Sequence, residues 1–544
     1  MYIVIGGIIV CGIIVSIVLA KKRSQQYKMQ KIRDAFGSVP HKKFSVKDLE
    51  YLLESEGYAY EVDAVTWNDL SMDAVYSRIN NCNSFIGEQV LYRELHCVSP
   101  DQKKIKAREE FIEQVSADTS YRESIQMVLA KISKGMYCYY LPMFVKEIDD
   151  FRLEKMWLYR ILSGTFLGAL LLGLMLNSNL LYVAGIIFVV NIVIYTVKKE
   201  EFELHFGMLS SVLDVITASN TLITKYKVAQ GGLAEDCLDA MKRMNKVAKK
   251  LGKFQEKVEI VRSGDLSGIV FEYLLGSVLW DIHVFDKIIK LISEDREEFE
   301  QLYTYLGEID MAISIASYRA SLPYYCRPIF QNINTIQIDE MYHPLITNPI
   351  ANDVQMNNHF IITGSNASGK STYVKSIAIN MILAQSIHTV LGTKAVIPYA
   401  NVLTSMAVQD DVLSGESYYM REINYLRRIV EQLQEDRLSL CIVDEILRGT
   451  NTKERIAASV AILEYMCERN CLVIVATHDI EVSRMLGGKY ENCHFTEVLE
   501  SEDIIFDYKV KAGVSTSTNA IKLLEYVGFP NSIVRHAREI VEGK

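Results

Sequence analysis

A stretch of the chain without any charged side chain, residues 161–197, limits most strongly what this sequence can fold into. At a helical rise of about 1.5 Å per residue, the stretch is too long to cross a hydrocarbon layer of about 30 Å once and long enough for two short crossings. Asn177, Ser178 and Asn179 lie near its middle, where a tight turn between two helices is needed. The sequence therefore predicts a transmembrane helical hairpin over residues 158–197.

Basic residues flank both ends of this stretch and indicate its orientation. Arg160 precedes it, and Lys198 and Lys199 follow it. Because basic residues are retained on the cytoplasmic side of a membrane, both ends are expected inside, with a small external turn between them. The alternative is a helical hairpin that is buried in the core of a soluble protein.

Residues 1–20 form a second uncharged stretch, and the basic run at residues 21–23 follows it directly. A secretory signal peptide has its positive charge before the apolar run, so this order favours an uncleaved membrane anchor. Together with the hairpin, the anchor gives three predicted transmembrane helices. Residues 21–157 and 198–544 then both lie on the cytoplasmic side, and the protein is expected in the cell membrane as a multi-pass protein.

The charge balance and the cysteines exclude some classes of protein. The formal net charge is −9, which argues against a chain that coats nucleic acid by its overall charge. The ten cysteines contain no C-x-x-C pair, and no histidine stands at zinc spacing from them. We therefore expect reduced thiols rather than disulfides or a zinc site.

The segment "GSNASGKST" carries the clearest chemical signal. It follows a short β-type run at residues 360–363, precedes a helical pattern, and fits the phosphate-loop pattern G-x-x-x-x-G-K-[ST]. In such a loop the backbone amides and the lysine contact the phosphates of ATP, and the hydroxyl of Ser371 binds Mg²⁺. The residues predicted to hold the nucleotide here are Gly364, Ser365, Asn366, Ala367, Ser368, Gly369, Lys370, Ser371 and Thr372.

Two further apolar runs end in residues that suit phosphate chemistry. Residues 438–443 end in Asp444 and Glu445, and residues 472–476 are followed closely by His478. Ligands of α/β sheets bind at the carboxyl ends of the strands. Asp444 is expected to hold the metal through water, Glu445 to orient or deprotonate the attacking water, and His478 to contact the γ-phosphate or that water.

Three kinds of ATPase combine a phosphate loop with a histidine after a strand: ABC transporter ATPases, chromosome-maintenance ATPases with long coiled coils, and the DNA mismatch repair MutS family. The short "LSGES" has only a superficial likeness to an ABC signature. "DEILRGTNT" resembles the MutS pattern D-E-x-x-R-G-T-x-T. "DDVLSGESYYMREI" resembles the MutS segment D-D-x-x-x-G-x-S-T-F-x-x-E, with Tyr418 and Tyr419 in place of the family's Thr and Phe. The chain is thus identified as resembling a membrane-anchored MutS-related ATPase.

This resemblance implies a fold, a partner and further site residues. The implied fold is an α/β P-loop ATPase domain (ABC-like, MutS type) at the C-terminus, preceded by an all-α lever and core domain. In the family, the serine that corresponds to Ser417 reaches the nucleotide held by the opposing subunit, which implies a homodimer with two composite sites. His343 and Pro344 look like the His-Pro step before the family's ATPase domain, so His343 is placed with the nucleotide-binding residues.

Six segments follow from the spans and the resemblance. They are residues 1–20 (anchor), 21–60 (basic linker), 61–157 (helical core, first part), 158–197 (hairpin), 198–330 (lever and core, second part, with a reduced clamp) and 331–544 (ATPase domain with a C-terminal helical dimerisation segment). The linker is too short for the family's mismatch-recognition domain with its Phe-x-Glu wedge. Phe254-Gln255-Glu256 has that pattern but lies in a charged helical stretch.

A basic stripe at residues 241–262 is the best candidate for contacts with DNA. Its members are Lys242, Arg243, Lys246, Lys249, Lys250, Lys253, Lys257 and Arg262. Such side chains neutralise DNA phosphates, but they also suit anionic lipid headgroups or a solvated helix face. Residues 266–292 follow; their charged side chains make a fourth span costly, so we expect a buried amphipathic helix there.

The sequence thus predicts a membrane-tethered MutS-like ATPase that binds ATP and Mg²⁺, hydrolyses ATP at composite dimer sites and acts on DNA without a recognisable mismatch wedge. The alternative is an ATP-driven enzyme or scaffold that remodels the membrane or binds protein partners and does not bind DNA.

Overall fold

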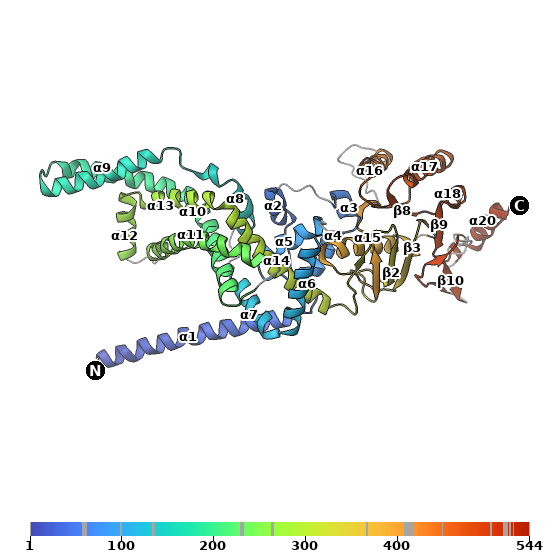
Figure 1. The fold of residues 1–544 in the computed structure, drawn as a ribbon, viewed down its shortest axis with the longest axis horizontal. Coiled ribbons are helices and arrows are strands. Elements are labelled where there is room, and N and C mark those ends of the chain that lie inside the picture. Colours follow the sequence, from blue (N-terminus) through green and yellow to red (C-terminus); the bar gives the residue numbers. More distant parts are fainter. Residues whose placement is uncertain are drawn as a thin grey trace. The chain divides into compact units, whose positions relative to one another are not determined.

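The computed structural model describes residues 2–56, 62–97, 101–132, 137–228, 233–262, 266–365, 368–406, 418–448, 450–500, 503–514, 521, 524–525 and 527–542. The chain divides into two compact units (Figure 1). The helical unit consists of Met1–Tyr58, Asn80–Arg93 and Gln102–Ala320, and the C-terminal unit of Ala59–Ile79, Glu94–Asp101 and Ser321–Lys544. Residues 59–79, which the sequence prediction grouped mainly with the helical core, thus cluster with the C-terminal unit.

The helical unit contains helices and short 3₁₀ turns in the part that the structure describes. The helices are α1 (Tyr2–Ala35), α2 (Val46–Glu56), most of α5 (Phe85–His96), α6 (Gln102–Ala117), α7 (Thr119–Leu129), α8 (Leu141–Lys146), α9 (Met156–Met175), α10 (Leu180–Thr224), α11 (Leu233–Arg262), α12 (Leu266–Ser277), α13 (Trp280–Glu294) and α14 (Arg296–Ala320). The long helix α14 forms the centre of the unit, because nearly all its residues from Phe299 to Arg319 are buried.

Buried charges of α14 are paired with charges from neighbouring helices. Glu308 lies 2.8 Å from Lys104 and 3.3 Å from Arg108, both on α6. Arg319 makes two hydrogen bonds, of 2.9 and 2.6 Å, with the carboxylate of Glu109. Such pairing is required because an isolated charge in a protein interior is strongly destabilising.

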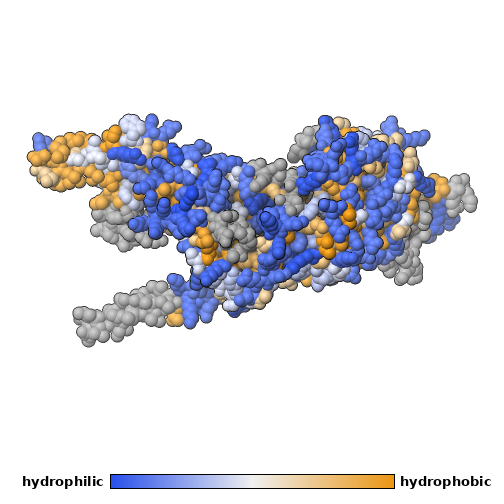
Figure 2. Space-filling view, viewed as in Figure 1, coloured by the Kyte–Doolittle hydropathy of each residue, from blue (hydrophilic) through white to orange (hydrophobic). Residues whose placement is uncertain are grey.

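Helices α9 and α10 form the predicted hairpin, and its turn lies at residues 176–179. Both helices are long and apolar enough to cross a membrane, and only 17% of each apolar window is buried. Figure 2 shows apolar side chains gathered on the surface of this hairpin. Leu174 and Met175 of α9 are 69% and 79% exposed. Within this chain the hairpin is therefore not a buried core element, which was the alternative interpretation.

Among the described residues, two helices are long and apolar enough to cross a membrane, not the three that the sequence predicts. The third predicted span, residues 1–20, falls in α1, which is continuous from Tyr2–Ala35. Most side chains of this segment lie outside the described residues, so the first span stays a prediction.

The prediction of one helix over residues 266–292 is wrong, because α12 and α13 are separate. The helical path is interrupted at Leu279, which adopts a left-handed conformation with φ of +50°. Polar side chains of the hairpin satisfy the backbone at this break: Asn191 donates to the carbonyl of Ser277 over 2.7 Å, and Ser163 donates to that of Val278 over 2.8 Å. These bonds replace those that a continuous helix would make. Only α13 fits the predicted buried amphipathic helix, since Ile282, Phe285, Ile288, Ile289 and Ile292 are buried.

The C-terminal unit contains a six-stranded sheet in the order β12-β9-β4-β8-β7-β6. Its strands are β4 (His359–Thr363), β6 (Asn401–Ser405), β7 (Ser439–Asp444), β8 (Cys471–Ala476), β9 (Tyr490–His494) and β12 (Lys511–Ala512), and all neighbours are parallel except β9 and β12. A second sheet has the order β1-β5-β2-β3, from β1 (Ile329–Phe330), β2 (Ile336–Met341), β3 (Asn352–Met356) and β5 (Lys394–Ile397). A small hairpin pairs β10 (Glu497–Glu500) with β11 (Asp503–Phe506).

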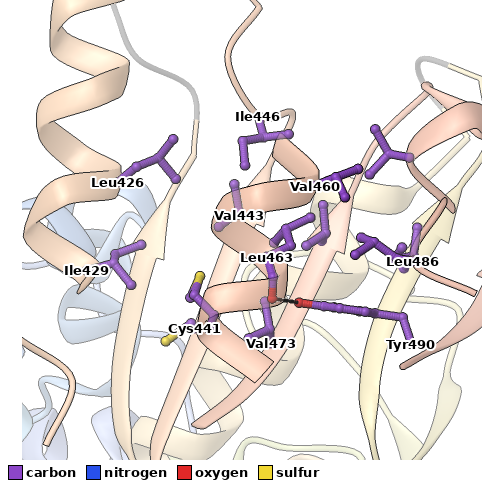
Figure 3. Close-up of a cluster of buried hydrophobic side chains, with 14 of the residues drawn as sticks. Leu426, Ile429, Cys441, Val443, Ile446, Val460, Leu463, Val473, Leu486 and Tyr490 are labelled. Carbon is purple, nitrogen blue, oxygen red and sulfur yellow. Dashed lines mark hydrogen bonds between the residues drawn. The ribbon is translucent and has the colours of Figure 1, made fainter. Parts of the chain in front are cut away.

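The helices of this unit are α3 (Ala64–Asp69), α4 (Met72–Ile79), α15 (Lys370–Ile387), α16 (Tyr418–Gln432), α17 (Thr452–Cys467), α18 (Ile480–Met485) and α20 (Asn531–Glu542). Residues of α16, α17 and α18 form a buried core with strands of the large sheet. Figure 3 shows side chains of β7, β8, α16 and α17 packed together, with the hydroxyl of Tyr490 donating to the carbonyl of Leu463 over 3.0 Å. The predicted apolar runs are buried strands of a parallel sheet, as their continuous apolar pattern indicates.

Candidate functional site

The carboxyl ends of three adjacent strands meet at one edge of the large sheet. Strand β8 lies between β4 and β7, with Ala476 opposite both Ile362 and Asp444. The loop after β4, the acidic pair after β7 and His478 after β8 therefore lie at the same edge. This arrangement brings together the three predicted parts of the site.

The loop between β4 and α15 depends on two glycines. Gly364 has φ of +149° and Gly369 has φ of +109°, conformations that other residues rarely adopt. A Cβ atom on Gly364 would lie 2.9 Å from the carbonyl oxygen of Phe495, so a larger residue does not fit there. Asn366 and Ala367 of the loop lie outside the described residues.

Lys370 is the first residue of α15, and its side chain binds to the loop that precedes it. Its side chain is buried, and Nζ donates to the carbonyl oxygens of Gly364 over 2.7 Å and Ser365 over 2.9 Å. Ser368 and Thr372 stand on either side of it, the first buried and the second exposed. A lysine that is held by carbonyl oxygens of the same loop can exchange these contacts for phosphate oxygens.

The two predicted metal-binding residues contact each other. The Ser371 hydroxyl forms a hydrogen bond with the carboxylate of Asp444, and burial raises the pKa of that carboxyl while this bond opposes the change. Among the described residues there is no group of three or more His, Cys, Asp or Glu side chains that could hold a metal ion. One hydroxyl and one carboxylate fit Mg²⁺, which usually takes few protein ligands and completes its shell with water and phosphate.

Glu445 lies in a strained turn directly after β7. Its φ is +60°, and Leu447 two residues later has φ of +56°. Such conformations cost about 1–3 kcal/mol for residues other than glycine, and they cluster at functional sites. A hydrogen bond of 2.8 Å from the Glu445 amide to the carbonyl of Ala476 holds the turn against β8. The turn places the side chain of Glu445 next to His478.

The carboxylate of Glu445 is held by two basic groups. Oε2 lies 3.0 Å from Nδ1 of His478, and Oε1 pairs with the guanidinium of Arg448. Burial favours a higher pKa for Glu445, but hydrogen bonds from His478 and Arg448 outweigh it and lower the pKa to about 2. The hydrogen bond from Glu445 in turn raises the pKa of His478.

A cavity of about 400 Å³ lies beside the loop. Gly369 and Thr372 line one side of it, and Tyr373, Phe495 and Tyr508 give it aromatic walls. His343, which the resemblance places with the nucleotide-binding residues, also lines the cavity. Burial lowers the pKa of His343 to about 4, so its ring is neutral near pH 7, and its Nδ1 accepts a hydrogen bond of 3.2 Å from the amide of Leu345.

Sequence reasoning missed part of this site. Arg448 belongs to the "DEILRGTNT" segment, but its contact with Glu445 was not predicted. The available signal was the position of this arginine shortly after Asp444 in the segment. Nothing in the sequence indicated that Phe495 and Tyr508 line the cavity, because both are distant from the loop in sequence. Ser417, predicted to contact a nucleotide in the opposing subunit, lies outside the described residues, and the structure does not test that role.

Comparison with known proteins places these residues in a family context. Residues 360–543 match the family model "MutS domain V". The chain is 29% identical over 275 residues to the DNA mismatch repair protein MutS of Thermotoga maritima, covering 48% of this chain and 33% of that protein. It is 32% identical over 279 residues to human MutS protein homolog 4, covering 46% of this chain and 29% of that protein. The chain thus spans about a third of the length of these relatives.

Proposed function

Because the chain belongs to the MutS family, whose domain V is the ATPase domain, we propose that it hydrolyses ATP at the edge of its large sheet. The observation that carries this proposal is the convergence of the Ser371–Asp444 pair and the Glu445–His478 pair beside the phosphate loop. The first pair suits a metal–phosphate complex, and the second suits an attacking water.

ATP fits the cavity and the loop together. The aromatic side chains of the cavity suit the adenine ring, and the loop amides with the amino end of α15 suit the phosphates. Lys370 leaves the carbonyls of Gly364 and Ser365 to reach the β- and γ-phosphates. Ser371 and Asp444 would hold Mg²⁺, and the bound ion would offset phosphate charge.

Glu445 and His478 complete the reaction at the γ-phosphate. Glu445 is ionised near neutral pH, because His478 and Arg448 lower its pKa to about 2. It accepts a hydrogen bond from the attacking water and orients it in line with the leaving group. His478 stands beside Glu445 and contacts the water or the γ-phosphate.

The active form is a homodimer in this proposal, with Ser417 of one subunit reaching the nucleotide in the other. Exposed apolar residues of the C-terminal helix α20 support a dimer contact near the end of the chain: Ile533, Ile540 and Val541 are 47%, 65% and 72% exposed. Buried in a contact, such residues contribute about 25 cal/mol per Å² of apolar surface.

The α9–α10 hairpin tethers the enzyme to the cell membrane, with the ATPase domain in the cytoplasm. Its support is the exposed apolar surface in Figure 2 and the length of both helices. Residues 1–20 form a further anchor in this proposal. Closure of the two ATPase domains on ATP, and reopening after hydrolysis, then moves helices attached to the membrane.

DNA is the proposed target, and α11 is the proposed contact surface. Lys242, Lys246, Lys249 and Lys253 are exposed at helical spacing, while Met244, Val247 and Leu251 on the other face are buried. Arg243 pairs with Glu298, and Lys242 lies 2.7 Å from Asp239, so part of the stripe is already neutralised. Side chains of Phe254–Glu256, Lys257 and Arg262 lie outside the described residues.

The test uses full-length protein in nanodiscs of neutral lipid, with duplex, mismatched and branched DNA titrated across a salt series with and without ATP. DNA binding that weakens with salt, changes with ATP and is reduced by Lys246→Glu/Lys249→Glu/Lys253→Glu supports the proposal. Lys290→Glu on α13 is the control for charge reversal at an exposed lysine. No binding at low salt, with ATP hydrolysis intact, favours the alternative of a membrane-remodelling or partner-binding ATPase.

A further inference from the structure

Helix α3 covers the free edge of the large sheet. Strand β6 is the edge strand and pairs only with β7 within this sheet, so its outer amides need other partners. Two of them find partners on α3: the Thr404 amide donates to Oγ1 of Thr66 over 3.2 Å, and the Met406 amide donates to Oδ2 of Asp69 over 2.9 Å. The Thr404 hydroxyl also donates to Oδ2 of Asp69, over 2.7 Å.

The N-terminal end of α3 also makes a hydrogen bond with helix α16. Asp63 caps α3 by accepting from the Thr66 amide over 2.8 Å, and the same oxygen accepts from Arg428 of α16 over 2.7 Å. Arg428 also donates to the carbonyl of Thr404. We call the set Asp63, Thr66, Asp69, Thr404, Met406 and Arg428 the α3 clasp.

The α3 clasp lies next to the catalytic turn. Its Met406 lines a small hollow together with Glu422, Asp444 and Glu445. The amide of Arg448, which pairs with Glu445, donates to Oε1 of Glu422 over 3.3 Å. A shift of the end of β6 or of α16 therefore reaches the residues around the attacking water.

On its other side α3 is joined to the end of α5. The ring of Trp67 stacks on that of His96, with centroids 3.6 Å apart, and the Val62 amide donates to the carbonyl of His96 over 3.1 Å. The residues of α5 divide between the two units, since Arg93 closes a segment of the helical unit and Glu94 opens one of the C-terminal unit. Helix α3 thus contacts the part of α5 that belongs to the C-terminal unit.

We propose that Asp69, supported by Asp63 and Thr66, is a positioning residue for ATP turnover that sets the end of β6 and the position of α16 and links them to α5. This inference rests on the proposed ATPase function, and it adds three residues, Asp63, Thr66 and Asp69, that lie outside the matched domain V of residues 360–543. The Thr404 hydroxyl and the Met406 amide both donate to Oδ2 of Asp69, and Asn removes the negative charge that strengthens these two hydrogen bonds. Asp69→Asn therefore disturbs the clasp with almost no change in volume.

The experiment measures ATP turnover and ATP binding separately in full-length protein. We expect Asp69→Asn to lower kcat at least tenfold while the Kd for ATP changes less than twofold, because the cavity and loop are not part of the clasp. Asp73→Asn is the matched control: Asp73 accepts a hydrogen bond of 2.8 Å from Trp67 but does not contact β6, and we expect its kcat to stay within twofold of the wild type. Thr66→Val is a milder variant, with an expected three- to fivefold loss of kcat, in case Asp69→Asn does not fold.

A second readout follows the link itself. The chain has three tryptophans, so Trp157→Phe and Trp280→Phe leave Trp67 as the reporter. We expect ATP to change Trp67 emission in this background and Asp69→Asn to abolish the change. Wild-type kcat in Asp69→Asn and Thr66→Val, with Lys370→Ala inactive, overturns the clasp and leaves the proposed ATPase in place. Absence of turnover in the wild type overturns both.

Discussion

Glu445 and His478 follow different strands, yet Oε2 of the first lies 3.0 Å from Nδ1 of the second. Their strands, β7 and β8, are parallel neighbours in register, with Asp444 opposite Ala476. The left-handed turn at Glu445 then directs the carboxylate toward the histidine rather than along the strand. A pair built in this way is sensitive to the position of both strand ends, and the role that we propose for the edge strand β6 depends on this sensitivity.

Glu445→Gln is expected to bind ATP and to lose hydrolysis. The amide cannot accept a proton from water, and a general base contributes about 10²–10⁴-fold to a rate. We therefore expect kcat to fall at least a hundredfold in steady-state phosphate release, with ATP retained in equilibrium binding. Glu454→Gln, at an exposed site at the start of α17, is the control and should keep wild-type turnover. Turnover within threefold of wild type in Glu445→Gln would show that another group acts on the water.

Lys370→Ala is expected to weaken ATP binding itself. The substitution removes a buried ammonium group whose contacts with Gly364 and Ser365 are available for exchange with phosphate. Hydrogen bonds to charged groups contribute about 1.5–3 kcal/mol, which corresponds to a Kd raised about ten- to a hundredfold. Calorimetric titration with a non-hydrolysable ATP analogue measures this change, and Lys394→Ala on β5, at an exposed position, is the control. An unchanged Kd would contradict the assignment.

The pH dependence of turnover is expected to follow His478. Glu445 raises the pKa of this histidine above its ordinary value of 6.5. Protonated His478 holds Glu445 in an ion pair, so activity is low below the raised pKa and increases as the pH passes above it. We expect the acid limb of kcat/KM at a pH above 6.5, and its loss or shift to lower pH in His478→Gln. A limb that keeps its position in the variant would assign the titration to another group.

The sequence predicted those parts of the molecule that have a local signal. Continuous apolar runs indicated β4, β7 and β8, and the residues at their carboxyl ends meet as expected. The uncharged stretch indicated the α9–α10 hairpin, and the polar residues at 177–179 indicated its turn. What escaped prediction depends on contacts between distant segments. Helix α3 meets β6 across more than three hundred residues of sequence, and the break at Leu279 depends on Asn191 and Ser163 of the hairpin.

The orientation of the hairpin can be tested at its turn. Ser178 is exposed between α9 and α10, and the proposed topology places it outside the cell. We expect Ser178→Cys to react with a membrane-impermeant maleimide on intact cells, above the background of the wild-type cysteines. Lys290→Cys, at an exposed site of α13, should react only after the membrane is opened. Labelling of both sites only after opening would contradict the proposed topology.

Tyr508→Ala is expected to raise the KM for ATP with little change in kcat. Tyr508 lines the cavity beside the loop and lies 3.2 Å from the place where a Cβ atom on Gly369 would be, whereas Glu445 and His478 are not among the residues that line this cavity. An aromatic contact contributes about 0.5–1.5 kcal/mol in addition to the effect of its buried area. Its loss should therefore raise KM about two- to tenfold. Tyr465→Ala on α17 removes an equally exposed tyrosine that does not line the cavity, and its KM should not change. A fall in kcat at constant KM in Tyr508→Ala would show that the cavity positions the reacting groups and does not bind the adenine ring. The proposed mode of ATP binding would then be wrong.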